Sequence, residues 1–306
     1  WDSTTETSLS SQHAVDPQES LLQALVLGLR DYATKCGFTT AVLGLSGGID
    51  SALVAVIACA ALGSDKVSAI LMPSPWSSEG SVKDATDLAR RLNIETKTIP
   101  ISTLMKSYDK ALEIHIGGVP QGLTAENLQA RIRGTLLMAI ANKQNHLLLS
   151  TGNKSELAVG YCTLYGDMNG GLSVIGDLYK TTVFNLCYWL DSRDSYRCRE
   201  ILGLPENIDL IGKAILTKPP SAELSPNQLD SDSLPAYEIL DSILKALIEK
   251  KSHPLTLAKH GYDSSLVKTV QKLLKQSEFK RQQAPPMLKV SDQAFGSGWR
   301  IPIAST

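Results

Sequence analysis

The sequence predicts an α/β protein in which a doubly wound parallel sheet is flanked by helices on both faces. Three observations predict this class. From residue 21 onward, helical segments alternate with short runs of strand character, as in parallel β-α-β units. The runs at 40–45 and 66–72 are short and mostly apolar, which favours strands buried on both faces. A glycine-rich turn then joins the first of these strands to a helix, and this turn also points to function.

The N-terminal half supplies the sheet elements in order. Leu22, Leu25, Val26 and Leu29 recur at helical spacing, and Gly37 ends that pattern. Each later strand is short, and a helical segment separates it from the next one. The expected helices are 21–36, 50–62, 82–92, 104–115, 125–142 and 177–190, and the expected strands are 40–45, 66–72, 94–99 and the run "HLLLS".

The C-terminal part is organised differently. Residues 161–176 are rich in glycine and tyrosine and are expected to be irregular, while 235–251 and 263–279 are expected helices. The first twenty residues are polar and lack an initiator Met, so we expect a flexible leader or linker there. Residues 21–306 are expected to form one domain, with a lid loop at about 217–233 and an irregular tail at 280–306.

Composition argues against several classes of protein. The 306 residues have a formal net charge of −1 and are 43% hydrophobic, as in a globular protein without a strongly basic face for nucleic acid. No uninterrupted run of eighteen apolar residues indicates a membrane span. The five cysteines form no Cys-x-x-Cys pair, and reduced thiols are their simplest interpretation. We therefore expect a cytoplasmic protein with neither nucleic-acid nor membrane partners.

The segment Ser46-Gly47-Gly48-Ile49-Asp50-Ser51 stands between the first strand and its helix. Glycine permits tight backbone angles and lets a ligand approach the chain closely. The first helical amides have no partner within the helix and carry the positive end of its dipole, so an anion suits this place. A plain turn is the alternative for Gly-Gly alone. All six residues at a strand end indicate a phosphate site, although neither the Walker nor the Gly-x-Gly-x-x-Gly pattern is present.

Asp50 is a carboxylate inside this expected anion site, where it would repel a phosphate unless a cation lay between them. Mg²⁺ prefers oxygens from one or two carboxylates together with phosphates. Glu156 follows the fourth strand in "STGNKSE", which is the matching position at the sheet edge. The sequence therefore predicts Asp50 and Glu156 as ligands of Mg²⁺.

The six residues resemble the PP-loop signature of the ATP pyrophosphatases, which cleave ATP between its α and β phosphates. Later motifs narrow the resemblance. They are "STGNKSELAVGYCTLYGDMNGG", "IGDLYKTTVFNL", "TKPPSAEL", "DSLPAY" and "FKRQQAPP", in this order. Together they resemble the synthetase domain of the NAD synthetase family, particularly its glutamine-dependent type, over about residues 21–303. The resemblance implies the Rossmann-like adenine nucleotide α-hydrolase (PP-loop) fold.

The resemblance implies a ligase. ATP would adenylate the nicotinate carboxylate of deamido-NAD and release pyrophosphate, and ammonia would convert the adenylate to NAD and AMP. The family also implies a homodimer and, in full-length glutamine-dependent enzymes, a glutaminase domain that supplies ammonia. This chain lacks such a domain, so we expect a fragment, with free ammonia as the alternative source. The six-residue signature by itself would also suit a tRNA-modifying or GMP-synthetase-like PP-loop enzyme, or a nucleotide sensor without catalysis.

The resemblance also implies roles for individual residues. Those expected to bind ATP are Ser46, Gly47, Gly48, Ile49, Asp50, Ser51, Thr151, Lys180, Lys218, Ser221 and Arg131. Those expected to bind deamido-NAD are Arg131, Arg133, Asn127, Tyr161, Asp167, Asp177, Lys280 and Arg281. Catalytic roles are expected for Asp50, Lys180, Ser221 and Asp167, and magnesium binding for Asp50 and Glu156.

Several of these residues also have simpler roles open to them. Arg131 and Arg133 are two positions apart and cannot share one helix face, so a surface ion pair is the alternative for one of them. Asp167 lies in a glycine-rich loop, where aspartate often only makes turns. Tyr161 could stack on a ligand ring or simply pack.

Overall fold

The computed structural model describes residues 16–206, 209–259, 261–296 and 298–303. The first fifteen residues of the expected leader lie outside this range. Its last four residues are helical, because the side chain of Asp16 accepts a hydrogen bond from the amide of Gln18 (2.7 Å) and Pro17 begins the first helix. The helix therefore starts four residues earlier than the apolar periodicity predicts.

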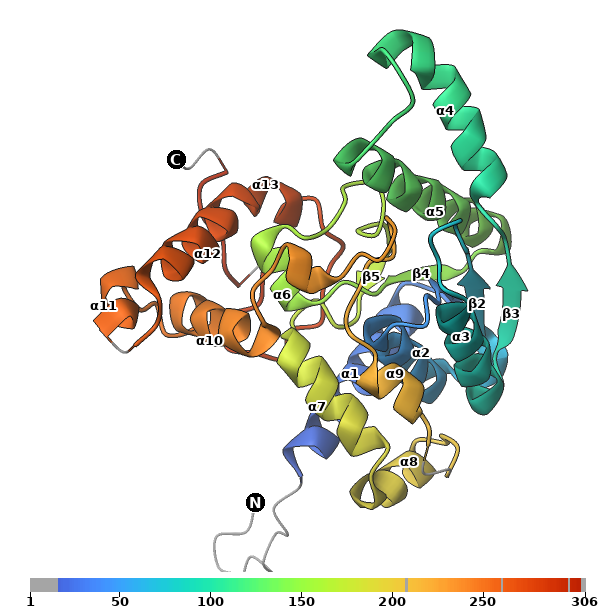
Figure 1. The fold of residues 1–306 in the computed structure, drawn as a ribbon. Coiled ribbons are helices and arrows are strands. Elements are labelled where there is room, and N and C mark those ends of the chain that lie inside the picture. Colours follow the sequence, from blue (N-terminus) through green and yellow to red (C-terminus); the bar gives the residue numbers. More distant parts are fainter. Residues whose placement is uncertain (1–15, 207–208, 260, 297, 304–306) are drawn as a thin grey trace, which may run out of the picture.

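The five strands found in the described residues form one parallel sheet in the order β3-β2-β1-β4-β5 (Figure 1). β1 is central, so that Ala41 lies opposite Val67 on one side and Leu147 on the other. β5 was not expected, because it contributes only two residues within a glycine-rich segment. The strands are β1 (Ala41–Gly44), β2 (Val67–Leu71), β3 (Glu95–Thr98), β4 (Leu147–Ser150) and β5 (Leu172–Ser173).

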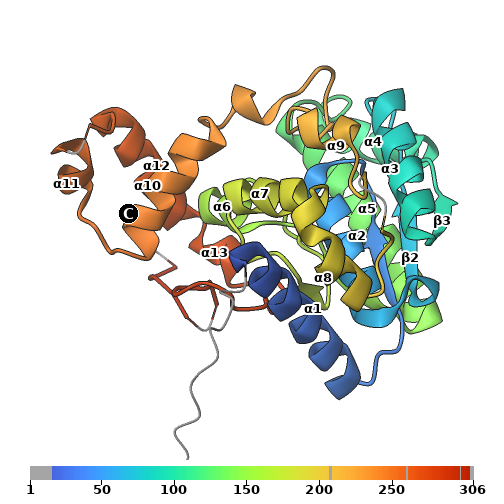
Figure 2. The same ribbon diagram turned by 90° about the horizontal axis from the view of Figure 1, so that it is seen from below.

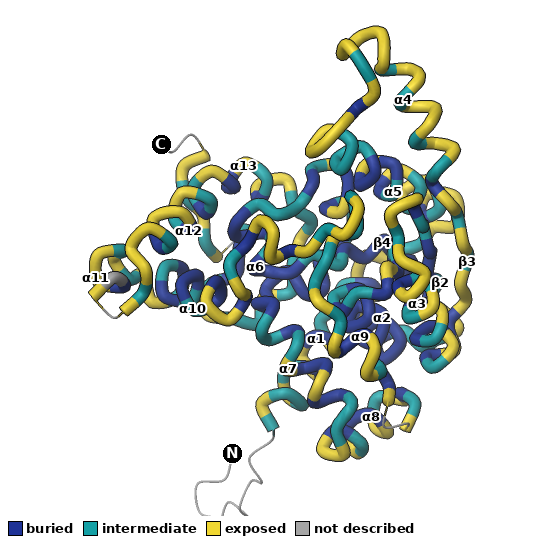
Figure 3. The backbone as a smooth tube through the Cα atoms, viewed as in Figure 1, coloured by how far each residue is buried: buried dark blue, intermediate teal, exposed yellow. Residues whose placement is uncertain are grey.

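Helices cover both faces of this sheet (Figures 1 and 2). One layer contains α1 (Pro17–Lys35), α2 (Ile49–Leu62), α3 (Glu79–Leu92) and α7 (Lys180–Leu190). The other layer contains α5 (Leu123–Gln144), preceded by α4 (Ser102–Ile116). α4 has no buried residue and projects away from the sheet (Figure 3). None of the described helices is both long and apolar enough to cross a membrane.

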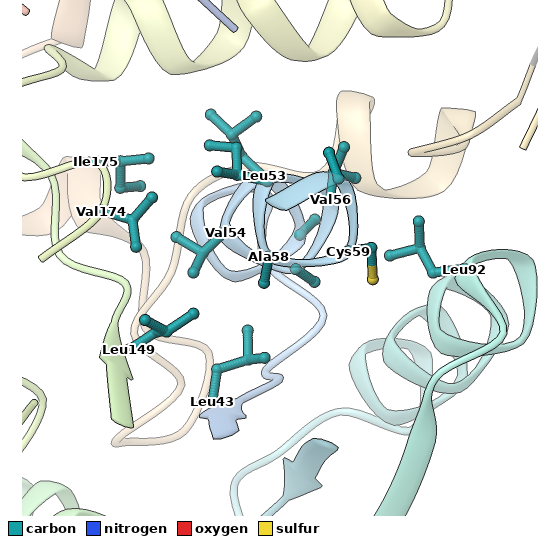
Figure 4. Close-up of a cluster of buried hydrophobic side chains, with 14 of the residues drawn as sticks. Leu43, Leu53, Val54, Val56, Ala58, Cys59, Leu92, Leu149, Val174 and Ile175 are labelled. Atoms are coloured by element: carbon teal, nitrogen blue, oxygen red, sulfur yellow. The ribbon is translucent and has the colours of Figure 1, made fainter. Parts of the chain in front are cut away.

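Successive residues of the central strands face opposite layers. Leu43 and Leu149 point toward α2 (Figure 4). Val42 and Leu148 instead belong to the cluster on the face covered by α5. All four side chains are buried, which explains why these strands read as continuous apolar runs rather than as alternating patterns. The fold class predicted from the sequence is the one observed.

A second hydrophobic core lies beside these layers, among the orange and red helices of Figure 1. It is built by α6 (Lys154–Val159), α10 (Tyr237–Ile248), α11 (Pro254–Lys259) and α12 (Ser264–Gln276), and α13 (Glu278–Arg281) packs beside α6 and α12. The other short helices are α8 (Tyr196–Ile201) and α9 (Lys213–Thr217), with 3₁₀ turns at Ser64–Lys66, Arg193–Ser195 and Asp230–Asp232. The long helices α10 and α12 were expected. The shorter ones span too few residues to show a helical period.

The order of connections creates a switch point between β1 and β4. The chain runs from β1 to β2 and then to β3 through α2 and α3 on one layer. It returns to β4 through α5 on the opposite layer. Neighbouring strands with connections on opposite layers leave a crevice beyond their carboxyl ends. The Ser-Gly-Gly turn follows β1 and the "GNKSE" segment follows β4, so both lie at this crevice.

Candidate active site

A cavity of about 310 Å³ lies beyond the carboxyl ends of β1 and β4. Its walls come from the turns after these strands, from the end of β2, from the glycine-rich loop before β5 and from the lid loop. The residues expected from the sequence that line it are Ser46, Gly48, Ile49, Asp50, Ser51, Arg133, Thr151, Glu156, Tyr161, Asp167, Lys180, Lys218 and Ser221. The switch point therefore gathers most of the expected site.

Gly47 is required by the shape of the turn after β1. Its φ of +81° lies in the left-handed region that side chains disfavour. A Cβ atom there would also lie 2.2 Å from the carbonyl oxygen of Ser81 in α3. Gly47 itself does not line the cavity. It brings the turn against the start of α3 and so sets the direction in which Gly48 and α2 begin.

Two hydroxyl groups hold this turn closed. The Oγ atoms of Ser46 and Ser51 are 3.1 Å apart. Ser51 also donates to the carbonyl of Gly48 (3.0 Å), whose amide donates to Ser46 Oγ (3.2 Å). The first amides of the fourteen-residue helix α2 lack acceptors within the helix, and the positive end of its dipole lies at the cavity. This arrangement suits a nucleotide phosphate.

Three charged residues converge beside the turn. The ammonium nitrogen of Lys180 lies 2.5 Å from Asp50 Oδ2 and 3.5 Å from Glu156 Oε1. Each residue lies in the first turn of a different helix: Asp50 in α2, Glu156 in α6 and Lys180 in α7. The side chain of Lys180 is only 3% exposed, whereas those of the carboxylates are 18% and 17% exposed. The two carboxylates lie together, as their positions after β1 and β4 predict.

The protonation of this cluster follows from burial and mutual charge. Burial disfavours the ammonium of Lys180, but Asp50 and Glu156 outweigh it and raise the pKa of Lys180 above its usual value. Burial raises the pKa of Glu156, and Asp50 adds to this effect while Lys180 opposes it. Lys180 therefore stays charged. Glu156, the more distant of its two partners, gives up its negative charge more readily than an ordinary glutamate.

Asn153 begins the helix that carries Glu156. Its side-chain oxygen accepts from the amide of Glu156 (3.0 Å), and Glu156 Oε2 accepts from the amide of Asn153 (3.2 Å), which together form a capping box. The side-chain nitrogen of Asn153 donates to Asp50 Oδ1 (2.9 Å). One buried asparagine therefore touches both carboxylates of the cluster.

The loop expected to act as a lid lies against the cavity. Lys218 forms an ion pair with Asp84 of α3 (2.5 Å) and also donates to the carbonyl of Gly47 (3.3 Å). Glu223 accepts from the hydroxyls of Ser78 (3.0 Å) and Ser81 (2.6 Å) at the start of α3. Polar contacts thus attach the loop to α3, and Gln129 of α5 also donates to the carbonyl of Leu224 (2.7 Å).

The opposite wall carries groups suited to an organic substrate. Asp167 faces the cavity and accepts from the amide of Thr163 (2.7 Å). Although its side chain is reachable from the cavity, the surrounding protein raises the pKa of Asp167 to about 6, against the lowering effect of the Thr163 amide. Arg133 donates to the carbonyl of Met72 (3.1 Å), and burial lowers the pKa of this guanidinium to about 10. The phenol of Tyr161 lines the same space.

Three expected ligand residues lie outside the cavity wall. Arg131 is exposed and donates to the carbonyl of Leu164 (3.2 Å). Asn127 accepts from the hydroxyl of Thr163 (2.8 Å), which links α5 to the glycine-rich loop. Lys280 donates to the carbonyls of Gly160 and Cys162 (2.7 Å each). Of the two arginines on α5, the structure brings only Arg133 to the cavity.

Two further expected ligand residues are buried in structural networks. Asp177 accepts from the amides of Val290 (2.8 Å) and Ser291 (2.7 Å) and pairs with Lys154 (2.9 Å), so its oxygens are already engaged. Arg281 pairs with Glu278 (2.9 Å). Its guanidinium also donates to the carbonyl oxygens of Leu157, Ala158 and Leu274. Neither residue lines the cavity, so the structure does not support the expected ligand roles.

Among the residues at or beside the cavity that sequence reasoning missed, four are acidic or contact an acidic residue. Asn153, Asp84 and Glu223 contact the expected residues Asp50, Lys218 and Ser221, respectively. Asp230 lines the cavity and accepts from the hydroxyl of Tyr237 (2.7 Å). Glu223 had a usable signal, because it lies two residues after Ser221 within "TKPPSAEL", and so did Asn153, which lies within "STGNKSE" three residues before Glu156, at the spacing of a capping box. Asp84 and Asp230 become visible only once the helices have been placed.

The carboxylates at the site suit a hard divalent cation. In the part of the chain that the structure describes, no group of three or more His, Cys, Asp or Glu side chains is arranged to hold an ion. The pair Asp50–Glu156 does suit Mg²⁺, which takes one or two carboxylates and fills its other positions with phosphate oxygens and water. Such a site would be completed by a nucleotide rather than by protein alone.

Comparisons with known proteins agree with this geometry. Residues 21–284 match the family model described as NAD synthase. A glutamine-dependent NAD(+) synthetase from Synechocystis sp. is 57% identical over 296 residues, covering 97% of this chain and 50% of that protein. The chain spans about half the length of the curated relatives it matches.

Solved structures extend the comparison to the fold. Glutamine-dependent NAD+ synthetase from Acinetobacter baumannii, in complex with ADP, has a TM-score of 0.62 and 39% identity, covering 96% of this chain and 51% of that chain. An NH3-dependent NAD synthetase from Campylobacter jejuni has a TM-score of 0.66 and 28% identity, covering 90% of this chain and 100% of that chain. The predicted PP-loop fold is therefore confirmed.

Proposed function

The chain belongs to the NAD synthase family, and on this premise we propose that it is a ligase that converts deamido-NAD to NAD with ATP and ammonia. The observation that carries the proposal is the cluster of Lys180 with Asp50 and Glu156 beside the Ser-Gly-Gly turn. An anion cradle, a buried cation and two carboxylates are the groups that ATP-dependent adenylation requires. The family membership supplies the acceptor.

The first proposed step is adenylation. An oxygen of the nicotinate carboxylate attacks the α-phosphorus of ATP, the bond between the α and β phosphates breaks, and pyrophosphate leaves. The turn amides and the hydroxyls of Ser46 and Ser51 would hold the leaving phosphates. Lys180 would neutralise charge that builds in the transition state, an effect that is strong in a site shielded from water.

Asp50 and Glu156 would hold Mg²⁺ in this complex. When bound, the ion supplies positive charge that lets phosphate approach these two carboxylates. Lys218 and Ser221 on the lid would close over the phosphates and keep water from the acyl-adenylate. In this structure Lys218 pairs with Asp84, so contact with a phosphate requires its side chain to turn from that ion pair.

The second proposed step is amidation. Ammonia attacks the acyl carbon, AMP leaves with the former carboxylate oxygen, and the nitrogen loses a proton. Asp167 is ionised at neutral pH, since its pKa is about 6, and it faces the cavity. It would therefore hold the nitrogen donor and take up the released proton. Tyr161 and Arg133 on the same wall would contact the dinucleotide.

The nitrogen source and the assembly are part of the proposal. The relatives named glutamine-dependent support ammonia made from glutamine by a glutaminase domain in a longer chain. A homodimer is supported by α4 and the start of α5, which expose large apolar side chains such as Ile114 (88%) and Leu123 (71%). The nitrogen source therefore rests on the relatives, and the homodimer rests on the family as well as on this surface.

The experiment that tests the function is direct. Purified protein is incubated with MgATP, deamido-NAD and ammonium chloride, and the formation of NAD is measured together with AMP. We expect both products in equal amounts. Parallel reactions offer a nucleotide acceptor of GMP-synthetase type and an unmodified tRNA. Turnover of either one without formation of NAD would favour another PP-loop enzyme.

A further inference from the structure

Asn153 is buried at the turn that follows β4, and its side-chain amide and backbone amide both bond to Asp50 or Glu156, while its backbone carbonyl accepts from the amide of Leu157 (3.1 Å). Its side-chain nitrogen donates to Asp50 Oδ1 (2.9 Å), and its backbone amide donates to Glu156 Oε2 (3.2 Å). Its side-chain oxygen accepts from the amide of Glu156 (3.0 Å). The residue thus joins two carboxylates that follow different strands of the sheet.

The carboxylate oxygens divide into two sets. Asn153 binds Oδ1 of Asp50 and Oε2 of Glu156. The other oxygen of each carboxylate, Oδ2 and Oε1, faces one atom, the ammonium nitrogen of Lys180, at 2.5 Å and 3.5 Å. A carboxylate that turned freely would offer either oxygen to the cation. Here one asparagine removes that freedom from both carboxylates at once.

We propose that Asn153 is a positioning residue that aims one oxygen each of Asp50 and Glu156 at a single cation position. Lys180 fills that position in this structure, and Mg²⁺ carried by the nucleotide competes for it. The proposal deepens the proposed function and rests on it for the identity of the nucleotide. Partners that orient metal ligands in this way commonly change metal affinity 10- to 100-fold when they are removed.

A helix cap is the simpler role for Asn153, and different atoms carry the two roles. The cap depends on Oδ1, which serine replaces with its hydroxyl oxygen. The positioning of Asp50 depends on Nδ2, which serine lacks, whereas Glu156 accepts from the backbone amide, which every variant keeps. Asn153→Ser therefore keeps the cap and removes the contact with Asp50. Asn153→Gly is a second variant, because glycine is also a favourable N-cap but offers no side chain.

The matched control removes a cap elsewhere. Asp263 begins α12 and accepts from the amide of Ser265 (2.9 Å), and it does not line the cavity. Asp263→Ala removes a helix cap without touching the carboxylates. If Asn153 acted only as a cap, Asn153→Ser and Asn153→Gly should change Mn²⁺ affinity no more than Asp263→Ala does, and only Asp263→Ala should clearly lower thermal stability.

The test measures metal affinity without turnover. Mn²⁺ is titrated into each protein in the presence of α,β-methylene-ATP, which cannot be cleaved between its α and β phosphates, and free Mn²⁺ is followed by electron paramagnetic resonance. We expect Asn153→Ser to raise the dissociation constant about tenfold or more, and Asp263→Ala to leave it unchanged. In turnover assays Asn153→Ser should raise the KM for Mg²⁺ by a similar factor, with kcat largely recovered at saturating Mg²⁺.

The outcomes separate the two proposals. The role of Asn153 would be overturned if a folded Asn153→Ser or Asn153→Gly variant bound Mn²⁺ as tightly as the wild type, even if the protein makes NAD. Weakened Mn²⁺ affinity in a protein that makes no NAD would overturn the proposed reaction and leave Asn153 as a positioning residue.

Discussion

The ammonium nitrogen of Lys180 lies 2.5 Å from Asp50 Oδ2, although the two residues are separated by 130 positions in the chain. Asp50 belongs to the first turn of the helix after β1, and Lys180 is the first residue of α7. Their pairing places a buried positive charge beside the phosphate-binding turn while neutralising a carboxylate that would otherwise repel a nucleotide. The site is therefore held near neutrality before ligands arrive.

Replacing Lys180 separates its two roles. Lys180→Met should lower kcat roughly 100- to 1,000-fold, the usual effect of removing one group that stabilises transition-state charge. The same variant should bind Mn²⁺ more tightly, because the lysine no longer competes for the two carboxylates. Steady-state kinetics and Mn²⁺ titration measure these effects. Lys35→Met, on the exposed part of α1, is the control and should change neither. A Lys180→Met enzyme within tenfold of wild-type kcat would remove Lys180 from the chemistry.

Gly47 offers a test of the turn itself. Gly47→Ala and Gly37→Ala both force a side chain into left-handed backbone, with φ of +81° and +76°, at a cost of ~1–2 kcal/mol each. Only the Cβ at Gly47 meets another atom, the Ser81 carbonyl at 2.2 Å, whereas nothing lies within 4 Å at Gly37. Urea unfolding should show a larger loss for Gly47→Ala, and ATP affinity should fall only in that variant. Equal losses would show that the contact with α3 does not shape the turn.

Asp167 should give the reaction a dependence on pH. Although Asp167 is reachable from the cavity, the surrounding protein desolvates its carboxylate and raises its pKa to about 6, so it is charged above this pH and neutral below it. If the anion holds the nitrogen donor, kcat/KM for deamido-NAD should fall as pH decreases through about 6, at a constant concentration of free ammonia. Asp167→Asn should be slow and lack this transition. Asp31→Asn, on exposed α1, should keep it. An unchanged profile in Asp167→Asn would assign the transition to another group.

Part of the site could be predicted from positions at the ends of strands. Asp50 follows β1 and Glu156 follows β4, and the carboxyl ends of parallel strands meet at one edge of the sheet. The proximity of the two carboxylates could therefore be inferred without coordinates. Asp177 shows the limit of this reasoning. It lies among the family motifs, yet its carboxylate is engaged by Lys154 and by the amides of Val290 and Ser291. No local pattern distinguishes a buried structural carboxylate from one that faces a ligand.

The fold was predictable for those elements long enough to show their hydrophobic period. The four strands with several apolar or β-prone residues and the longer helices were expected, since their periods extend over enough positions. β5 and α6 were missed because two and six residues show no period. The consequence for the site is direct, because α6 begins at the Asn153 cap that contacts both Asp50 and Glu156.

The fate of a single oxygen atom tests the proposed chemistry most directly. Deamido-NAD labelled with ¹⁸O in its nicotinate carboxylate is converted by the protein with MgATP and ammonia, and the products are examined by mass spectrometry. Adenylation of the carboxylate predicts one ¹⁸O in AMP for each NAD formed from fully labelled substrate, and none in pyrophosphate. An AMP without label, or label in inorganic phosphate accompanied by ADP, would contradict attack of the carboxylate on the α-phosphorus.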